Sequence, residues 1–216
     1  MTQNAIDKES LCKMFCAAAG ALKTESAVLS DIDSRFGDGD HGVTMNKVAL
    51  AIEGRVADWR KGDGTSIHDF LEGLGDAIMA VGGGSAGPLY GTLVGGLADP
   101  LANETEIDGP TLKAMLCGAR DAMFEITKAR IGDKTMMDAL IPAVEVAESA
   151  PDDVGAILLV AAAAAENGAE ETKKQVSKFG RARSYGEQTI GTPDAGATST
   201  AILFRGLAGA GLKFGE

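Results

Sequence analysis

Four aspartates lie close together in the sequence. Asp31, Asp33, Asp38 and Asp40 fall within ten residues, offset only by Arg35. Carboxylate oxygens are hard ligands that suit Mg²⁺, and a bound cation would relieve their mutual repulsion. The spacing is not that of an EF-hand, because Arg35 stands where that loop needs an oxygen ligand. A solvated acidic turn is the alternative, but the glycine-rich surroundings favour a metal site.

Two glycine-rich segments, 37–42 and 82–87, match the pattern G-x-G-x-x-G. The dinucleotide-binding fingerprint requires a strand before this pattern, whereas helical patterns precede both segments here. A Rossmann fold is therefore excluded. Glycines still allow close approach of the backbone, and a helix N-terminus offers free N–H groups to an anion. The segment GGGSAGPLYG, with Pro88 near a first helical turn, fits such a site, and a plain turn between helices is the alternative.

The segment GDKT at 132–135 has two interpretations. It lacks the Gly-Lys pair of a Walker A motif. Thr135 and Asp138 have the spacing of a capping box that starts the next helix. Alternatively, Lys134 reaches a phosphate.

Other polar residues have both structural and functional interpretations. His41 adjoins the aspartates and is the better functional candidate of the two histidines, whereas His68 is expected on a solvated helix face. Arg181 and Arg183 form a solvated pair or, beside a phosphate, an anion site. Asp194 has the character of an N-cap for the last helix.

The elements that position these residues are expected to be helices. Apolar residues recur at helical spacing along the chain, and no alternating run indicates a strand. The fold class is therefore all-α. The expected helices span residues 5–22, 25–35, 43–60, 66–81, 88–101, 110–129, 135–149, 153–178 and 196–213.

Four loops rich in glycine or unusual polar residues are separated from one another by two helices each. Two antiparallel helices return the chain to the same end of a bundle. The four loops should therefore meet at one end, and the intervening connections should lie at the other. The loops span residues 36–42, 82–87, 130–135 and 179–196, and the other connections span 61–65, 102–109 and 150–152.

Length and charge limit the classes of function. The 216 residues are interpreted as a single domain, 1–216, and 29 of them are glycine. A net charge of −11 disfavours nucleic acid and anionic lipid as partners, but not divalent cations. The longest apolar run, 154–165, is too short to span a membrane, and the first ten residues do not resemble a signal peptide.

The three cysteines indicate a reducing compartment. Cys12, Cys16 and Cys117 form no CxxC pair and are odd in number, which is typical of reduced thiols in a cytoplasmic protein. Cys12 and Cys16 lie one helical turn apart and are expected to pack in the core.

Four segments occur in a specific order: GDGDHG, GGGSAGPLYG, GDKTMMDAL and GRARSYGEQTIGTPDAGATS. In this order and spacing they resemble the L subunit of the dihydroxyacetone kinase family, the nucleotide-binding half of that kinase. The resemblance extends from about residue 20 to the C-terminus. It implies a closed up-and-down barrel of eight antiparallel helices with the nucleotide site at one end, in agreement with the positions of the loops. Ala86 stands where the family commonly has serine, and Ser85 precedes it.

The resemblance also implies a set of site residues. Asp33, Asp38 and Asp40 would hold two Mg²⁺ ions on the phosphates of ATP or ADP. Ser85 and Ala86 would contact phosphate. The nucleotide-binding residues implied are His41, Gly42, Thr44, Gly84, Ser85, Ala86, Met136 (near the adenine), Arg181, Asp194, Ala195 and Gly196.

The function implied is that of a phosphotransferase with an alcohol acceptor. A separate K subunit would hold dihydroxyacetone or another short ketose such as erythrulose, since no general base or sugar site is evident in this chain. Either free ATP or a phosphocarrier protein that rephosphorylates bound ADP could supply the phosphoryl group. The alternative function is a non-catalytic helical module that binds Mg-nucleotide or an apolar ligand, and an aspartate-metal phosphohydrolase ranks below it. A homodimer is an open possibility for the assembly of the chain.

Overall fold

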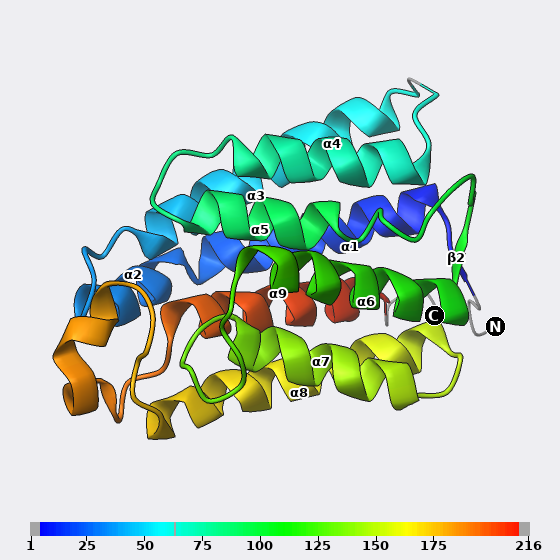
Figure 1. Cartoon of the computed structure of the whole chain (residues 1–216). Coiled ribbons are helices and arrows are strands. Elements are labelled where there is room, and N and C mark those ends of the chain that lie inside the picture. Colours follow the sequence, from blue (N-terminus) through cyan, green and yellow to red (C-terminus); the bar gives the residue numbers. More distant parts are fainter. Residues whose placement is uncertain (1–4, 63, 212–216) are drawn as a thin grey trace.

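The computed structural model describes residues 5–62 and 64–211, and these are mostly helical, as expected (Figure 1). Helices run roughly along one axis, so that their connections collect at two ends of the molecule. The α-helices are α1 (Lys8–Thr24), α2 (Ser26–Ser34), α3 (His41–Arg60), α4 (Ile67–Met79), α5 (Ala86–Gly95), α6 (Gly109–Ile126), α7 (Met137–Ser149), α8 (Val154–Glu171) and α9 (Ala195–Gly211). Two 3₁₀ helices, η1 (Thr172–Lys174) and η2 (Arg181–Thr189), and two strands, β1 (Ala5–Ile6) and β2 (Ile107–Asp108), complete the elements.

The helices that begin at the end carrying β2 are capped by side chains. Asp7, Ser66, Asp108 and Asp153 each accept a hydrogen bond from a backbone N–H in the first turn of α1, α4, α6 and α8. Such a cap satisfies a donor that the helix itself leaves free, and it contributes about 1 kcal/mol. These local sequences therefore define where the four helices start.

Helices that follow one another in the chain pack side by side. The order of contact runs from α1 to α3, then through α4, α5, α6, α7, α8 and α9, and α9 packs back against α1. Where α9 meets α1, a Cβ added to Gly206 would lie 2.4 Å from Ala18 Cα. Where α5 meets α4, a Cβ on Gly91 would lie 2.7 Å from Met79. Glycine at these positions permits helices to approach more closely than any other residue would allow.

The structure corrects the expected absence of strands. β1 and β2 pair antiparallel, with Ala5 opposite Asp108 and Ile6 opposite Ile107. Each strand has two residues, which is too short for an alternating pattern to be recognised. The pair buries Ile6 and Ile107 and joins the start of the chain to the connection before α6, so the expected helix over 5–22 begins at Lys8.

Other expected boundaries also differ from the structure, and the largest differences are at the ends of two helices and in one loop. The helix expected over 88–101 ends at Gly95, and turns follow, although Leu97 and Leu101 remain buried and so maintain the apolar pattern. The helix expected over 153–178 ends at Glu171 and is followed by η1. The loop expected over 179–196 contains η2, and residues 212–213 of the last expected helix lie outside the described residues. Among the helices described, none combines the length and apolar character needed to cross a membrane.

Candidate functional site

The four glycine-rich loops meet at one end of the helices, as their spacing predicts. The connection before α3, the connection before α5, and η2 lie together at this end, opposite β2 (Figure 1). They surround a cavity of about 280 Å³, to which the loop before α7 contributes Lys134. Segments separated by more than a hundred residues thus form one site.

The aspartates at 33, 38 and 40 are brought together at the wall of this cavity. Asp33 comes from the last turn of α2, and Asp38 and Asp40 from the loop that leads into α3. A carboxylate oxygen from each lies within 4.8 Å of the other two. A Cβ on Gly37 would overlap the Asp33 carboxylate, so glycine is needed for the loop to pass this close. Asp31 instead pairs with Arg35 across 3.4 Å on the surface.

Charge is unevenly distributed among the three carboxylates. The Arg181 guanidinium forms an ion pair with Asp38, and its hydrogen bond lowers the pKa of that carboxyl group. Burial, followed by the nearby charge of Asp38, raises the pKa of Asp40. One carboxylate of the cluster is thus paired with an arginine, and ionisation of another is disfavoured. A divalent cation bound among the three carboxylates would be stabilised by them.

Two helices begin at the cavity without a side-chain cap in the part of the chain that the structure describes. These are α3, preceded by Asp40, and α5, preceded by Ser85, and we call their first turns the open starts. The Gly83–Gly84 turn before α5 adopts positive φ, 141° and 60°, and Gly83 lies against the buried side chain of Thr44 from α3. The open starts are therefore held side by side. The His41 N–H donates to Asp33 Oδ2, and the remaining first-turn N–H groups and the helix dipoles suit an anion such as phosphate.

The turn before α9 is capped, as the sequence predicts. Asp194 Oδ2 accepts a hydrogen bond from Ala197 N–H at 2.8 Å. Burial raises the pKa of this carboxyl group to about 6, against the lowering effects of that hydrogen bond and of Lys134. The ionised form of Asp194, which lines the cavity, is thus disfavoured by its surroundings.

Lys134 borders the cavity, and its side chain is held by the surrounding backbone. It is 4% exposed, and its ammonium group donates to the carbonyl oxygens of Thr172 and Thr192, each at 2.5 Å. Burial lowers the pKa of this ammonium. One arm of the predicted capping box is present, since the Asp138 carboxylate accepts the N–H of Thr135 at 2.8 Å. These bonds favour the structural interpretation of this segment over a lysine that reaches for phosphate.

The His41 side chain borders the cavity, but its imidazole is held by a hydrogen bond within the protein. Its backbone N–H donates to Asp33 Oδ2 at 3.3 Å, and its Nε2 lies 2.8 Å from Ser199 Oγ. Burial lowers the pKa of the imidazole. Ser199 and its neighbour Tyr90 were not predicted as site residues, although both belong to the quoted segments, GGGSAGPLYG and GRARSYGEQTIGTPDAGATS, because nothing in those segments indicates a role for either hydroxyl group.

The other predicted residues divide into those that line the cavity and those that lie behind it. Gly42 and Thr44 are buried in the first turn of α3, and Met136 packs against Gly196. None of these four residues is among the described residues that line the cavity. Arg183 also lies outside that lining. The predicted residues that line the cavity are Asp33, Asp38, Asp40, His41, Gly84, Ser85, Ala86, Arg181, Asp194 and Ala195.

Aromatic and apolar residues of the lining were missed. Phe36 and Phe179 both border the cavity, and the Phe36 ring packs against Tyr185 of η2 with centroids 5.2 Å apart. Each phenylalanine directly precedes a glycine of a predicted loop, which is the one sequence signal that could have identified them. They give the cavity an apolar side suited to a planar group.

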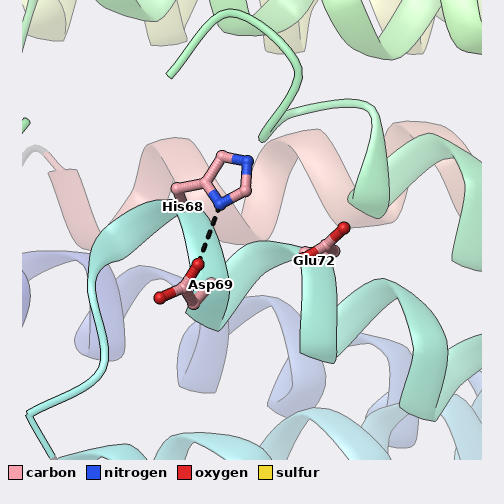
Figure 2. A group of neighbouring side chains, drawn as sticks. All are labelled: His68, Asp69 and Glu72. Carbon is pink, nitrogen blue, oxygen red and sulfur yellow. Dashed lines mark hydrogen bonds and ion pairs between the residues drawn. The ribbon is translucent and has the colours of Figure 1, made fainter. Parts of the chain in front are cut away.

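A second group of ligand-type side chains lies at the other end, at the start of α4 (Figure 2). Oxygen or nitrogen atoms of His68, Asp69 and Glu72 lie within 4.8 Å of one another. His68 Nδ1 is bonded to Asp69 across 3.0 Å, and Asp69 also interacts with the capping residue Ser66. This part-exposed group is explained by local bonding at a helix start, in keeping with the solvated position expected for His68.

Comparison with known proteins identifies the family. A model of the DAK2 domain matches residues 35–209. The chain belongs to the DAK2 domain family. It is 31% identical to the ADP-binding subunit DhaL of the PEP-dependent dihydroxyacetone kinase of Escherichia coli, covering 87% of this chain and 89% of that subunit. It is 36% identical to a D-erythrulose kinase of Mycolicibacterium smegmatis, covering 92% of this chain and 34% of that kinase. The chain thus spans about a third of the erythrulose kinases it matches.

Two solved structures of a dihydroxyacetone kinase share the fold of this chain. The native dihydroxyacetone kinase of C. freundii matches with a TM-score of 0.71 and 25% identity, covering 92% of this chain and 34% of that one. The same kinase in complex with AMP-PNP and Mg²⁺ matches with a TM-score of 0.68 and 24% identity, covering 92% and 33%. The second match supports the fold alone.

Proposed function

We propose that this chain is the Mg-nucleotide-binding subunit of a dihydroxyacetone or related short-ketose kinase. The observation that carries the proposal is that the three clustered carboxylates and the open starts of α3 and α5 line the same cavity. Carboxylates for a metal and free backbone donors for phosphate are the two parts that nucleotide phosphoryl transfer requires. The names of the DhaL relatives, ADP-binding subunits of dihydroxyacetone kinases, support this assignment.

The residues present fit Mg²⁺. Asp33, Asp38 and Asp40 offer only oxygen ligands, from carboxylates already within 4.8 Å of one another, and no described histidine or cysteine side chain joins them in that group. We assign two Mg²⁺ ions to these three side chains, as in the sequence-based prediction. When bound, the ions would neutralise charge on the transferred phosphoryl group.

The chain's own residues bind and orient the nucleotide in this proposal. The open starts, with Gly84, Ser85 and Ala86, donate backbone N–H groups to phosphate oxygens. Arg181 stands at the cavity mouth, where its guanidinium is within reach of both Asp38 and a phosphate. Phe36 and Phe179 provide apolar contact for the base and limit the access of water.

The remaining predicted residues act from behind the lining. Thr44 fixes the position of Gly83, Met136 packs under the Asp194–Gly196 turn, and Gly42 allows α3 to begin against α2. We propose that Gly42, Thr44, Met136 and Gly196 shape the nucleotide pocket through the backbone.

The architecture proposed is a closed barrel of eight antiparallel helices in one domain, 1–216. The cyclic order of helix contacts, with α9 against α1, supports it, if α2 is counted as a continuation of α1. A barrel open at one end to loops and stabilised by a continuous core would keep the open starts in fixed positions.

The ketose acceptor is assigned to a separate K-type subunit. Support comes from the length of the relatives, because this chain matches about a third of the erythrulose kinases but most of the DhaL subunits. Free ATP and a phosphocarrier protein are the two phosphoryl donors to be compared.

The three free thiols are in keeping with a cytoplasmic location. Whether the chain forms a homodimer is to be tested by measuring its mass in solution.

Reconstitution tests the proposal. The chain is combined with a K-type subunit and either ATP or a phosphocarrier, and phosphorylation of dihydroxyacetone and erythrulose is measured. Asp38→Ala is expected to abolish activity and Mg-nucleotide binding, with unchanged helicity. Asp31→Ala, which removes the same charge outside the cavity lining, is the matched control and is expected to retain both.

Three results would contradict the kinase assignment. Unchanged nucleotide affinity in Asp38→Ala would overturn the metal ligands. Release of phosphate by the chain alone would indicate a phosphohydrolase. Retained nucleotide binding without ketose phosphorylation, for either donor, would indicate a non-catalytic binding module.

A further inference from the structure

A buried hydrogen-bond network joins the three helices α3, α5 and α9 near their starts at the cavity. At its centre, Ser199 Oγ lies 2.8 Å from His41 Nε2 and 2.7 Å from the Tyr90 hydroxyl. The Tyr90 hydroxyl also lies 2.9 Å from Thr200 Oγ1 and 3.2 Å from the Gly196 carbonyl oxygen, and its single proton can be donated to one of these partners or to Ser199. Tyr90, Ser199 and Thr200 are each at most 1% exposed. The network therefore joins one residue of α3, one of α5 and the first two turns of α9.

The network continues to the cavity wall through His41. The His41 backbone N–H donates to Asp33 Oδ2, and a hydrogen bond links the imidazole to the backbone of Ala195. Asp33 and Ala195 both line the cavity, whereas Tyr90 and Ser199 are not among its described lining residues. A change at Tyr90 or Ser199 can therefore reach a bound molecule only through other groups.

The Tyr90 hydroxyl is not required to give the buried hydroxyl groups of Ser199 and Thr200 a hydrogen-bond partner. Without it, Ser199 Oγ still donates to the Ala195 carbonyl at 2.9 Å, and Thr200 Oγ1 still donates to the Gly196 carbonyl at 2.9 Å. A phenylalanine at position 90 would leave both side chains bonded. What the hydroxyl adds is a connection between α5 and α9, two helices that do not follow one another in the chain.

We propose that Tyr90 and Ser199 are positioning residues that hold the open starts of α3 and α5 and the turn before α9 at the spacing that receives the nucleotide phosphates. This inference rests on the proposed function. Donors on three separate helices bind one phosphate chain well only if their relative positions are set before binding. The Ser199-centred network fixes these relative positions. Its Tyr90 and Ser199 hydroxyl groups lie outside the cavity lining, so they do not compete with the ligand for hydrogen bonds.

Calorimetric titration of the full chain with Mg-ADP tests the inference in three variants. Tyr90→Phe is expected to weaken binding about five- to tenfold, the effect of losing one buried hydrogen bond. Ser199→Ala, which also removes the partner of His41, is expected to weaken binding further. Because both act through one network, the double variant should bind no more than about twofold more weakly than Ser199→Ala.

Trp59→Phe is the matched control for a merely structural effect. Trp59 is a buried aromatic residue whose indole N–H donates to the Thr65 carbonyl at 2.9 Å, at the far end of α3. This variant should lower the thermal midpoint at least as much as Tyr90→Phe and leave Mg-ADP affinity unchanged at a temperature where all variants are folded.

The outcomes distinguish the inference from the proposed function. Weakened binding in Tyr90→Phe and Ser199→Ala, with unchanged affinity in Trp59→Phe, supports the inference. Wild-type affinity in Tyr90→Phe, or an equal loss in Trp59→Phe, overturns it and leaves the proposed function in place. Absence of Mg-ADP binding to the wild-type chain overturns the proposed function and the inference together.

Discussion

Two glycines of α9, one packed against α1 and the other not, provide a sharp test of the helix packing. A Cβ at position 206 of α9 would lie 2.4 Å from Ala18 Cα and 2.9 Å from Ala18 N, whereas ordinary contacts are 3.4–4 Å. Gly206→Ala would therefore require α9 and α1 to separate by about 1 Å, at a cost of roughly 1–3 kcal/mol that helix propensity only partly offsets. At Gly209, no described atom lies within 4 Å of the added Cβ. Gly209→Ala should thus gain up to ~1 kcal/mol.

The assay is thermal and urea unfolding followed by circular dichroism. A difference of about 2–3 kcal/mol between the two variants corresponds to roughly 4–12 °C in Tm for a chain of this length. Both variants change glycine to alanine in one helix, so the unfolded-state contribution is the same in each. A Gly206→Ala variant as stable as Gly209→Ala would refute the close approach of α9 to α1.

Two further predictions concern charged groups near the cavity whose pKa is shifted by burial. The pKa of Asp194 is raised to about 6 from 3.8, so its stabilising contribution is present below pH 4 and lost as pH rises through 6. Relative to Asp194→Asn, which retains a capping side chain, the wild type should lose on the order of 3 kcal/mol between pH 4 and 7, and parallel profiles in urea unfolding would contradict this. Lys134→Met leaves two buried carbonyls without their donor and should lower the free energy of unfolding by about 3–5 kcal/mol. Lys178→Met breaks an exposed pair with Asp133 and should cost less than about 1 kcal/mol; equal losses would show that burial does not matter here.

Most of the fold could be predicted from local patterns. Apolar residues at helical spacing identified the nine α-helices of the described chain, and the two-helix separation of the loops placed them at one end. The 3₁₀ helix η2 was missed because its sequence, RARSYGEQT, has no apolar period and includes Gly186 at a φ of 54°. The β1–β2 pair was missed because two residues cannot show alternation.

The candidate site was predicted where its residues are close in sequence. Asp33, Asp38 and Asp40 lie within eight positions, so their cluster can be recognised without a fold. The bond between Tyr90 and Ser199 joins residues 109 positions apart, in two separate quoted segments, and only the folded positions of α5 and α9 bring the two hydroxyl groups together. Burial of Lys134 could not be predicted for the same reason, since its partners belong to distant segments.

The role of the carboxylates is tested most directly by titrating the wild-type chain with ADP at fixed Mg²⁺ and again with Mg²⁺ removed by a chelator. If Asp33, Asp38 and Asp40 hold metal on the phosphates, calorimetry should show saturable binding in Mg²⁺. Affinity should fall by at least about a hundredfold without Mg²⁺, since the three clustered carboxylates would then face the phosphates with no cation between them. Equal ADP affinity in the two conditions would contradict the account.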